Sequence, residues 1–449
     1  MQWTESQFDA ISAREGTVLV SAAAGSGKTA VLVQRAIERL TDPVSPTPAN
    51  RMLIVTFTKA AAAEMRSRLE RRLFELMREN PSDRNLRRQS VLMHQAHIGT
   101  VDSFCAEMAR EFFHLLDLSP DFKILSDKRE EEMMNQALEE AVGSAFDQGW
   151  IYDLADAFTG ERDDRRLGGM VLTLYRFMQS HPFPKDWLKE KVAMYEKGDP
   201  APWEKVILSY TAGAGEYCAA VLSRAIELCG EDEKLYASFF PALSADRDGC
   251  LRIAEAARAG DWDLTASLQR GFAPARRGAL RGFDKDDPSL KRLENCRKQV
   301  KNVISGLDTV LCVDRKGCTE ELLGAAPLLG ALERLTLDFE QRYREKKREK
   351  SFLDYSDLEH CAIELFCRPG GGVTPAAMEV RGRFDEIMID EYQDINEVQD
   401  SIFKAVSHNG ENLFMVGDVK QSIYGFRRAM PEIFLRAKAS FDKYDRELG

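Results

Sequence analysis

The stretch TVLVSAAAGSGKTAVLVQRAIERL, residues 17–40, decides the fold. Its first five residues are mostly β-branched and apolar, its middle consists of small residues, and its end has the spacing of an amphipathic helix. This order predicts a strand, a tight loop and a helix. Gly25 and Gly27 let backbone N–H groups curl around phosphate oxygens at a helix N-terminus, where partial positive charge gathers. The alternative is a small-residue turn before a buried helix, which GSGKT directly after a strand disfavours.

The loop also supplies candidate ligands for a nucleotide and its metal ion. Lys28 adds a full positive charge for the β and γ phosphates, and the Thr29 hydroxyl is a candidate Mg²⁺ ligand. Alanine stands at position 22, where the first glycine of this motif is usual. The predicted cofactor-binding residues of the loop are Ala22, Ala23, Ala24, Gly25, Ser26, Gly27, Lys28 and Thr29.

Further strand-like runs follow at 51–57, 97–101, 384–390 and 412–418. They alternate with helical patterns, one of them from about Lys59 to Asn80, which predicts an α/β fold with a parallel sheet. Between residues 120 and 351 the pattern is mainly helical, apart from FKILSD at 122–127. We therefore expect residues 1–119 and 352–449 to form one domain, interrupted by a large α-helical insertion at 120–351.

The segment IMIDEYQD, residues 387–394, places an acidic pair at the end of a predicted strand. Asp390 is the candidate Mg²⁺ ligand, and Glu391 is the candidate general base that activates water. Taken alone, an Asp-Glu pair after a strand is more typical of the favourable charge at a helix N-terminus. Beside AAAGSGKT, we prefer the catalytic interpretation.

A third block, MVGDVKQSIYGFRRA at residues 415–429, also leaves a predicted strand. The neutral amide of Gln421 near the strand end suits contact with both a γ phosphate and the attacking water. Next to it, aromatic and basic groups are interleaved, as a platform for stacked single-stranded bases requires: Tyr424, Phe426, Arg427 and Arg428. Taken alone, this segment is more typical of a core aromatic pair with surface arginines.

Five segments occur in an order that resembles the helicases of the UvrD, Rep and RecB group in superfamily 1: AAAGSGKT, TFTKAAAAEM, GTVDSF, DEYQD and GDVKQSIYGFRRA. WTESQ at 3–7 and PEIFL at 431–435 are most similar to the AddA family of bacterial helicase-nuclease subunits. The resemblance covers 1–125 and 339–449. It implies a RecA-like P-loop NTPase motor domain, with ATP and Mg²⁺ as cofactors. The implied partners are single- and double-stranded DNA and an AddB-type subunit, in the cytoplasm of a bacterium.

The resemblance also implies roles for single residues. Gln7 matches the glutamine that reads the adenine edge, for which an amide is suited because it has both a donor and an acceptor. The alternative for Gln7 is an ordinary polar residue on an N-terminal helix. The catalytic positions are Lys28, Glu391 and Gln421. The implied DNA-binding positions are Phe57, Thr58, Lys59, Thr100, Ser103, Phe104, Tyr424, Phe426 and Arg427.

The segment YREKKREKSFLDYSDL at 343–358 resembles the point where the chain re-enters the motor domain. We interpret its KKREK part, residues 346–350, as the solvated face of a charged helix.

Composition limits the class of protein. The 449 residues are 44% hydrophobic and 30% charged, which is ordinary for a folded chain. The net charge of −11 argues mildly against nucleic acid as a partner, but 12 acidic and three basic residues between Ser126 and Asp164 account for most of it. Nine cysteines without a C-x-x-C pair, and no signal-like or membrane-spanning run, indicate a reducing cytosolic compartment.

Three functions fit parts of this pattern. We expect the N-terminal motor part of an ATP-dependent 3′–5′ DNA helicase in double-strand-break repair and recombination, with a second motor lobe and a nuclease domain beyond Gly449. The alternative is a module that binds ATP and single-stranded DNA but hydrolyses little by itself, because the arginines of a second lobe are missing. A small-molecule kinase is disfavoured, since it has no use for DEYQD or QSIYGFRRA.

Overall fold

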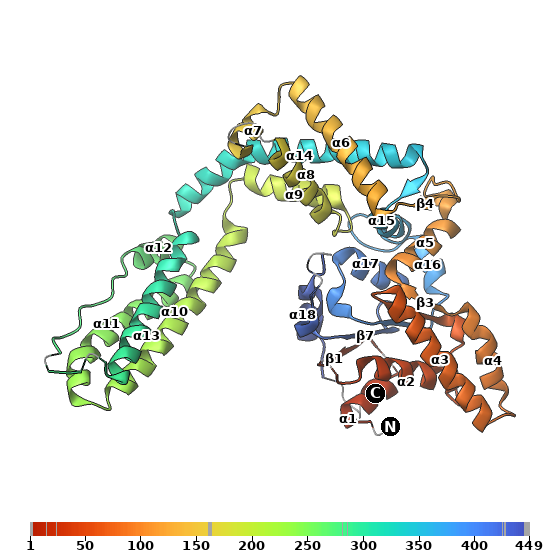
Figure 1. Ribbon diagram of the computed structural model, residues 1–449, viewed down its shortest axis with the longest axis horizontal. Coiled ribbons are helices and arrows are strands. Elements are labelled where there is room, and N and C mark those ends of the chain that lie inside the picture. Colours follow the sequence, from red (N-terminus) through yellow and green to blue (C-terminus); the bar gives the residue numbers. More distant parts are fainter. Residues whose placement is uncertain are drawn as a thin grey trace. The chain divides into compact units, whose positions relative to one another are not determined.

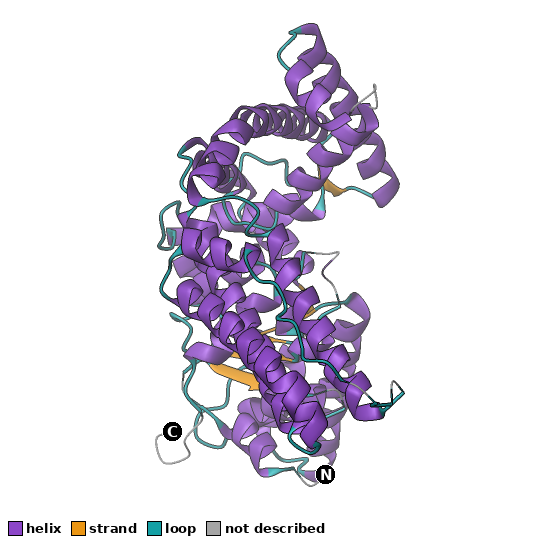
Figure 2. Cartoon of the chain, turned by 90° about the vertical axis from the view of Figure 1, so that its left-hand side faces the viewer, coloured by secondary structure: helices purple, strands orange, loops and turns teal. Residues whose placement is uncertain are grey.

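The computed structural model describes residues 3–443 except 15, 24, 160–163, 281, 285, 424, 426 and 427. The chain divides into two compact units, one of residues 1–188 with 332–449 and one of residues 189–331. Figure 2 shows that helices dominate and that strands are few. Within the described ranges, no helix has both the length and the apolar character that crossing a membrane requires. All nine cysteines are free thiols.

Five strands form one parallel sheet in the first unit, in the order β1-β7-β6-β2-β3. They are β1 (Val18–Ser21), β2 (Met52–Thr56), β3 (His97–Thr100), β6 (Glu386–Ile389) and β7 (Leu413–Gly417). Two short strands, β4 (Lys123–Ile124) and β5 (Phe352–Leu353), pair with each other. Each strand of the main sheet lies within one of the predicted runs, so the predicted α/β fold with a parallel sheet is confirmed.

Helices of the first unit connect these strands. Before the second unit they are α1 (Glu5–Ser12), α2 (Lys28–Thr41), α3 (Lys59–Glu79), α4 (Arg84–Leu92), α5 (Val101–Glu111), α6 (Asp127–Asp147), α7 (Tyr152–Thr159) and α8 (Asp164–Met178). After it they are α15 (Tyr355–Phe366), α16 (Pro375–Arg381), α17 (Glu397–Val406) and α18 (Pro431–Ser440). Two more helices, α9 (Pro184–Glu196) and α14 (Arg315–Glu349), extend past the limits of the units.

Each face of the main sheet carries its own hydrophobic core. On β2, Met52 and Ile54 join the core formed with α1 to α4, whereas Leu53 and Val55 join the core formed with α5 and α15 to α18. The same alternation continues on β6 and β7. Figure 1 shows α2 and α17 on opposite sides of the sheet. Covering both faces is what a parallel sheet requires, because its crossover connections place helices on each side.

The second unit is a helical bundle with a separate core. Its helices are α10 (Ala201–Cys229), α11 (Glu233–Arg258), α12 (Trp262–Arg270) and α13 (Pro288–Gly306). A Cβ at Gly215 would lie 2.9 Å from the carbonyl oxygen of Cys250, so glycine allows α10 and α11 to approach closely. The bundle lies inside the 120–351 range predicted as an insertion, but those domain limits stay a prediction.

A buried ion cluster joins the end of α14 to the start of α15. The ammonium of Lys347, 2% exposed, lies 2.6 Å from Asp354 Oδ2 and 2.5 Å from Asp357 Oδ2. The Tyr343 hydroxyl donates to the same Asp354 oxygen at 3.0 Å. Burial opposes the charged ammonium, but the two carboxylates outweigh it and raise the pKa of Lys347. The expectation of a solvated KKREK face is therefore wrong at Lys347, because two carboxylates on α15 and its N-cap provide a buried partner.

A second buried carboxyl on α15, that of Glu359, forms no salt bridge with any cation in the described part of the chain. Glu359 is 8% exposed and accepts a hydrogen bond from Gln399 Nε2 at 2.6 Å. Burial is the main cause that raises the pKa of Glu359 to about 7. A glutamate in an unfolded chain titrates near pH ~4.3. The folded chain therefore keeps a proton that the unfolded chain releases, and this carboxyl costs stability as the pH rises through that interval.

We predict that Lys347→Met lowers the free energy of unfolding by roughly 3–5 kcal/mol at pH 7, because it leaves the buried Asp354 and the half-buried Asp357 without their cation. Urea unfolding followed by circular dichroism measures this loss. Lys350→Met, on an exposed side chain just after α14, is the matched control and stays within about 0.5 kcal/mol of wild type. Equal effects of the two substitutions would show that the cluster does not stabilise the fold.

We predict that Glu359→Gln raises the free energy of unfolding at pH 8 by roughly 1–3 kcal/mol and changes it little near pH ~4.5. The amide keeps an oxygen for Gln399 but carries no charge to bury. Urea titrations at the two pH values measure the difference, with the exposed Glu364→Gln on the same helix as control. A Glu359→Gln variant that is less stable than wild type at pH 8 would contradict this prediction.

Candidate functional site

The candidate site lies where three neighbouring strands end. Because β1, β7 and β6 are parallel and adjacent, their carboxyl ends meet at one edge of the sheet. The loop before α2 leaves β1, the segment from Asp390 leaves β6, and the segment from Asp418 leaves β7. Clefts at this edge are the usual ligand sites of open α/β sheets.

The glycine-rich loop has the geometry of a phosphate cradle. Gly25 and Gly27 have φ angles of +75° and +81°, which side-chain-bearing residues rarely adopt. Gly27 is the N-cap of α2, so Lys28 and Thr29 form its first turn, where free backbone N–H groups point outward. The Ser26 hydroxyl is buried and finds no hydrogen-bond partner among the residues that the structure describes. Ala22 and Ala23 belong to the same loop, and Ala24 lies outside the described residues.

Gln7 supports this loop from α1. Its Nε2 donates to the Ser26 carbonyl at 2.8 Å, and its Oε1 accepts the Thr4 N–H at 2.9 Å as part of a capping box. The amide is therefore held in one orientation between the start of α1 and the phosphate loop. Its predicted contact with adenine stays a prediction.

Lys28 and Glu391 form the central contact of the site. Lys28 Nζ lies 3.1 Å from Glu391 Oε2, and the lysine side chain is only 9% exposed. Glu391 itself has a φ angle of +53°, which is uncommon for a residue with a side chain and costs backbone energy. Strain of this kind persists only where surrounding contacts maintain it, as they do here on both sides of the carboxylate.

Asp390 offers a carboxylate for a divalent cation. Burial first, and then the charge of Glu391, raise the pKa of Asp390 to about 6. Its Oδ1 accepts the Glu391 N–H at 3.1 Å. A hydroxyl and a carboxylate suit Mg²⁺, which commonly takes few protein ligands and completes its shell with phosphate and water oxygens. Thr29 and Asp390 thus fit the predicted ion, and the described residues form no cluster of three or more acidic, His or Cys ligands.

Gln421 is held at the end of β7. Its Nε2 donates to Asp418 Oδ2 at 2.6 Å, and this bond is the main cause that lowers the pKa of Asp418. The Gln421 amide therefore has a fixed orientation at the end of β7, next to β1, which leads into the phosphate loop.

A cavity of about 830 Å³ opens at the same edge, beside the ends of β2 and β3. It brings together Phe57, Thr58, Lys59 and Thr100, four of the residues predicted to bind DNA. Thr58 and Thr100 are also N-caps, of α3 and α5, so these polar side chains begin helices as well as line the cavity. The cavity also includes Arg428, from the third block, and Tyr355, from the segment at 343–358. Four further polar or basic side chains lie outside all the motifs: Arg176, Gln179, Ser180 and Asn396.

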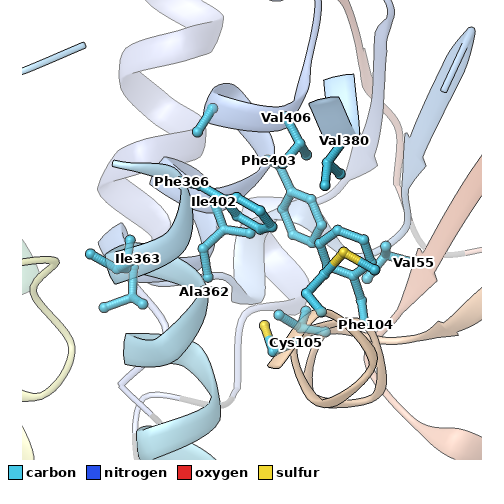
Figure 3. Close-up of a cluster of buried hydrophobic side chains, with 14 of the residues drawn as sticks. Val55, Phe104, Cys105, Ala362, Ile363, Phe366, Val380, Ile402, Phe403 and Val406 are labelled. Carbon is cyan, nitrogen blue, oxygen red and sulfur yellow. The ribbon is translucent and has the colours of Figure 1, made fainter. Parts of the chain in front are cut away.

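Two predicted DNA-contact residues have other roles. Phe104 is 4% exposed and stacks on Phe403 with ring centroids 6.3 Å apart, inside the core that Figure 3 shows. A ring in this position cannot stack on a base without leaving the core, so its burial argues against the predicted direct contact between Phe104 and DNA. The hydroxyl of Ser103 bonds to the backbone of Thr100 and completes the capping box of α5.

The remaining three predicted contacts, Tyr424, Phe426 and Arg427, lie outside the described residues. Their neighbour Arg428 is described, and its guanidinium lies 5.8 Å from the ring centroid of Phe177. The φ angle of Arg428 is +64°.

Gln393 is a residue of the site to which the sequence analysis gave no role, although it lies inside DEYQD. It is 1% exposed and bonds to the Glu391 side chain and to the backbone of Asp418. An amide close to three acidic positions is the sequence signal that could have indicated it.

The sequence of this chain matches a known protein family over most of its length. Residues 3–168 and 284–442 match the family described as UvrD/REP helicase N-terminal domain. A Moorella thermoacetica protein, named as a subunit of an ATP-dependent helicase/nuclease, is 37% identical over 452 residues, which cover 97% of this chain and 32% of that protein. Proteins of the same name from Geobacillus kaustophilus and Acetivibrio thermocellus are each 36% identical. Those matches cover 99% and 97% of this chain, and 37% and 36% of the relatives.

This chain therefore spans about a third of the length of the curated relatives it matches. The family match itself extends over well more than half of the chain. The glycine-rich loop, the acidic pair and the order of the motifs all fall within the matched residues. The chain belongs to the UvrD/REP helicase N-terminal domain family.

Proposed function

We propose that this chain is the N-terminal motor part of an ATP-dependent DNA helicase that acts in double-strand-break repair and recombination. The observation that carries the proposal is the contact between Lys28 and Glu391, which joins the phosphate loop to the acidic segment at one sheet edge. Membership of a helicase N-terminal domain family supports it. The 3′–5′ direction of movement rests on the resemblance alone.

In the proposed reaction the γ phosphate of ATP is transferred to water. Lys28 and the N–H groups at the start of α2 would hold the phosphates, and Thr29 and Asp390 would hold Mg²⁺, which neutralises charge on the phosphate oxygens. Glu391 would orient the attacking water and accept its proton. Gln421 would contact the γ phosphate and that water with a neutral amide. Preorganised charges of this kind are the main source of catalysis in phosphoryl transfer.

For DNA we propose the cavity beside β2 and β3. The ring of Phe57 would stack on a base, and Lys59 and Arg176 would approach phosphates, as in other single-strand grooves. Because β6 lies between β7 and β2, the same strand borders the proposed ATP site and the proposed DNA groove. A movement of the acidic segment after β6 would therefore change both the proposed ATP site and the proposed DNA groove.

The relatives' shared name describes a subunit of a helicase/nuclease. We propose that this chain likewise acts with an AddB-type partner and with further domains that the relatives' greater length provides.

The second candidate is a module that binds ATP and single-stranded DNA but hydrolyses ATP slowly by itself. The short coverage of the relatives favours it for the isolated chain. Turnover by the purified 449 residues, with and without single-stranded DNA, decides between the two, because strong stimulation by DNA excludes the module.

We predict that Lys28→Ala and Glu391→Gln each lower ATP turnover at least ~100-fold, since one removes phosphate charge and the other the general base. Only Lys28→Ala should also weaken binding of a fluorescent ATP analogue by ~10-fold or more. Lys404→Ala, which removes an exposed lysine on α17, is the control and keeps both properties. Near-normal turnover by both site variants would refute the proposed chemistry.

We predict that Phe57→Ala weakens single-stranded DNA binding by roughly 5- to 100-fold, the range expected for one lost stacking contact. Phe104→Leu is the contrasting variant, because its ring lies in the core. It should lower the thermal midpoint and leave DNA affinity within about twofold, since core losses affect stability first. Fluorescence anisotropy with a labelled oligothymidine measures both, and equal affinity losses would contradict the proposed groove.

A further inference from the structure

A single buried amide joins the ends of β6 and β7. Gln393 lies in the short turn Tyr392–Asp394 that follows β6 and is 1% exposed. Its Nε2 donates to Glu391 Oε2 at 2.8 Å and to Asp394 Oδ2 at 3.0 Å. Its Oε1 accepts the backbone N–H of Asp418 at 2.8 Å. The amide nitrogen therefore bonds to residues that follow β6, and the amide oxygen bonds to the residue that follows β7.

The contacts continue in both directions. On one side, Glu391 Oε2 also faces the ammonium of Lys28 at 3.1 Å. On the other, the Asp418 carboxylate accepts from Gln421 Nε2 at 2.6 Å. One unbroken series of polar contacts thus runs from the phosphate loop, through Glu391 and Gln393, to Gln421.

The side chain of Gln393 is tightly packed against the end of β7. A Cβ on Gly417 would lie 2.5 Å from Gln393 Oε1 and 2.9 Å from Phe434 Cε2. Glycine at the end of β7 is therefore what allows the amide to reach the Asp418 N–H. Because a close-packed interior has little free space, a displacement of the end of β6 is transmitted through the Gln393 side chain to the end of β7.

We propose that Gln393 is a positioning residue that transmits occupancy of the phosphate loop to the segment after β7. The proposal rests on the function proposed above. Phosphates and Glu391 compete for the ammonium of Lys28, so binding of ATP draws that ammonium away from the carboxylate. Glu391 then keeps Gln393 as its partner among the described side chains, and Gln393 fixes the carboxylate where it orients water. The same shift displaces Asp418 and hence Gln421, within residues 418–423 after β7.

A simpler role would account for the same bonds, namely satisfying a buried N–H at the end of β7. The two roles differ in what substitution changes. A merely structural amide affects stability, whereas a transmitting amide affects how the segment after β7 responds to nucleotide.

The test compares hydrogen exchange of residues 418–423 in the 449-residue chain, with and without Mg²⁺ and the slowly hydrolysed analogue ATPγS. In wild type, nucleotide should slow exchange there by at least ~3-fold, because local openings become rarer when the segment is held. Gln393→Met, which has similar volume and no polar atoms for these bonds, should show less than half of that change on a logarithmic scale. Its affinity for ATPγS should stay within about threefold, since Lys28 and the loop are intact.

Gln393→Glu tests the bond to Glu391 separately. It also provides a second variant in case Gln393→Met does not fold. It keeps an oxygen for the Asp418 N–H but loses the donor to Glu391, so it too should lose the response. Gln89→Met is the matched control, because Gln89 is equally buried at 1% and its side-chain hydrogen bonds within the described residues go to residues 40, 47, 49 and 85, away from the site. It should keep the wild-type response.

Two results would overturn the proposal, and they are distinguishable. A wild-type response in both Gln393 variants, with nucleotide bound, would reject the role of Gln393 and leave the proposed function standing. Failure of wild type to bind ATPγS would reject the proposed function and the transmission together.

Discussion

The contact between Lys28 and Glu391 joins residues 363 positions apart and depends on the whole first unit being assembled. Helix α2 is fixed to β6 at both ends of that strand. At the carboxyl end Lys28 meets Glu391, and at the amino end Arg35 and Arg39 hold Glu386 at 2.7 and 3.0 Å. Glu386 and Arg35 are 2% and 3% exposed, so removing the carboxylate of Glu386 would leave the charge of Arg35 buried without its ion-pair partner and strongly destabilise the unit. The phosphate loop thus has a fixed position because its helix is attached to the strand that carries the acidic pair.

Much of this could be predicted because it is local. The runs that became β1, β2 and β6 are short, apolar and bounded by loop residues, and the glycine loop has a spacing that few other structures use. The parallel order follows from alternation with helices. A local pattern does not show which charged group a residue will pair with when that group lies on a distant segment or on a neighbouring helix. Lys347 looked like a solvated lysine because its burial depends on Asp354 and Asp357 folding back against it.

Phe104 shows a different limit. Motif resemblance assigned it to DNA contact, but Val101, Phe104, Cys105 and Met108 have the spacing of a buried helix face, and all four are core residues. The periodicity of α5 was the better guide, because a motif states that a position matters without stating which surface it faces. Thr100, at the start of the same helix, does reach the cavity. The site residues of this segment therefore lie at the helix start rather than along it.

The choice of amides at Gln393 and Gln421 follows from the charges around them. Glu391, Asp394 and Asp418 all lie within hydrogen-bond reach of one amide or the other. A lysine or arginine at position 393 would compete with Lys28 for the carboxylate of Glu391 and hold it as an ion pair, which removes its value as a base. A carboxylate there would repel Glu391 and Asp394 and would have no N–H to donate to either of them. Only a neutral group with both donors and an acceptor holds the Glu391 side chain in place without an ion pair, while still bonding to the end of β7.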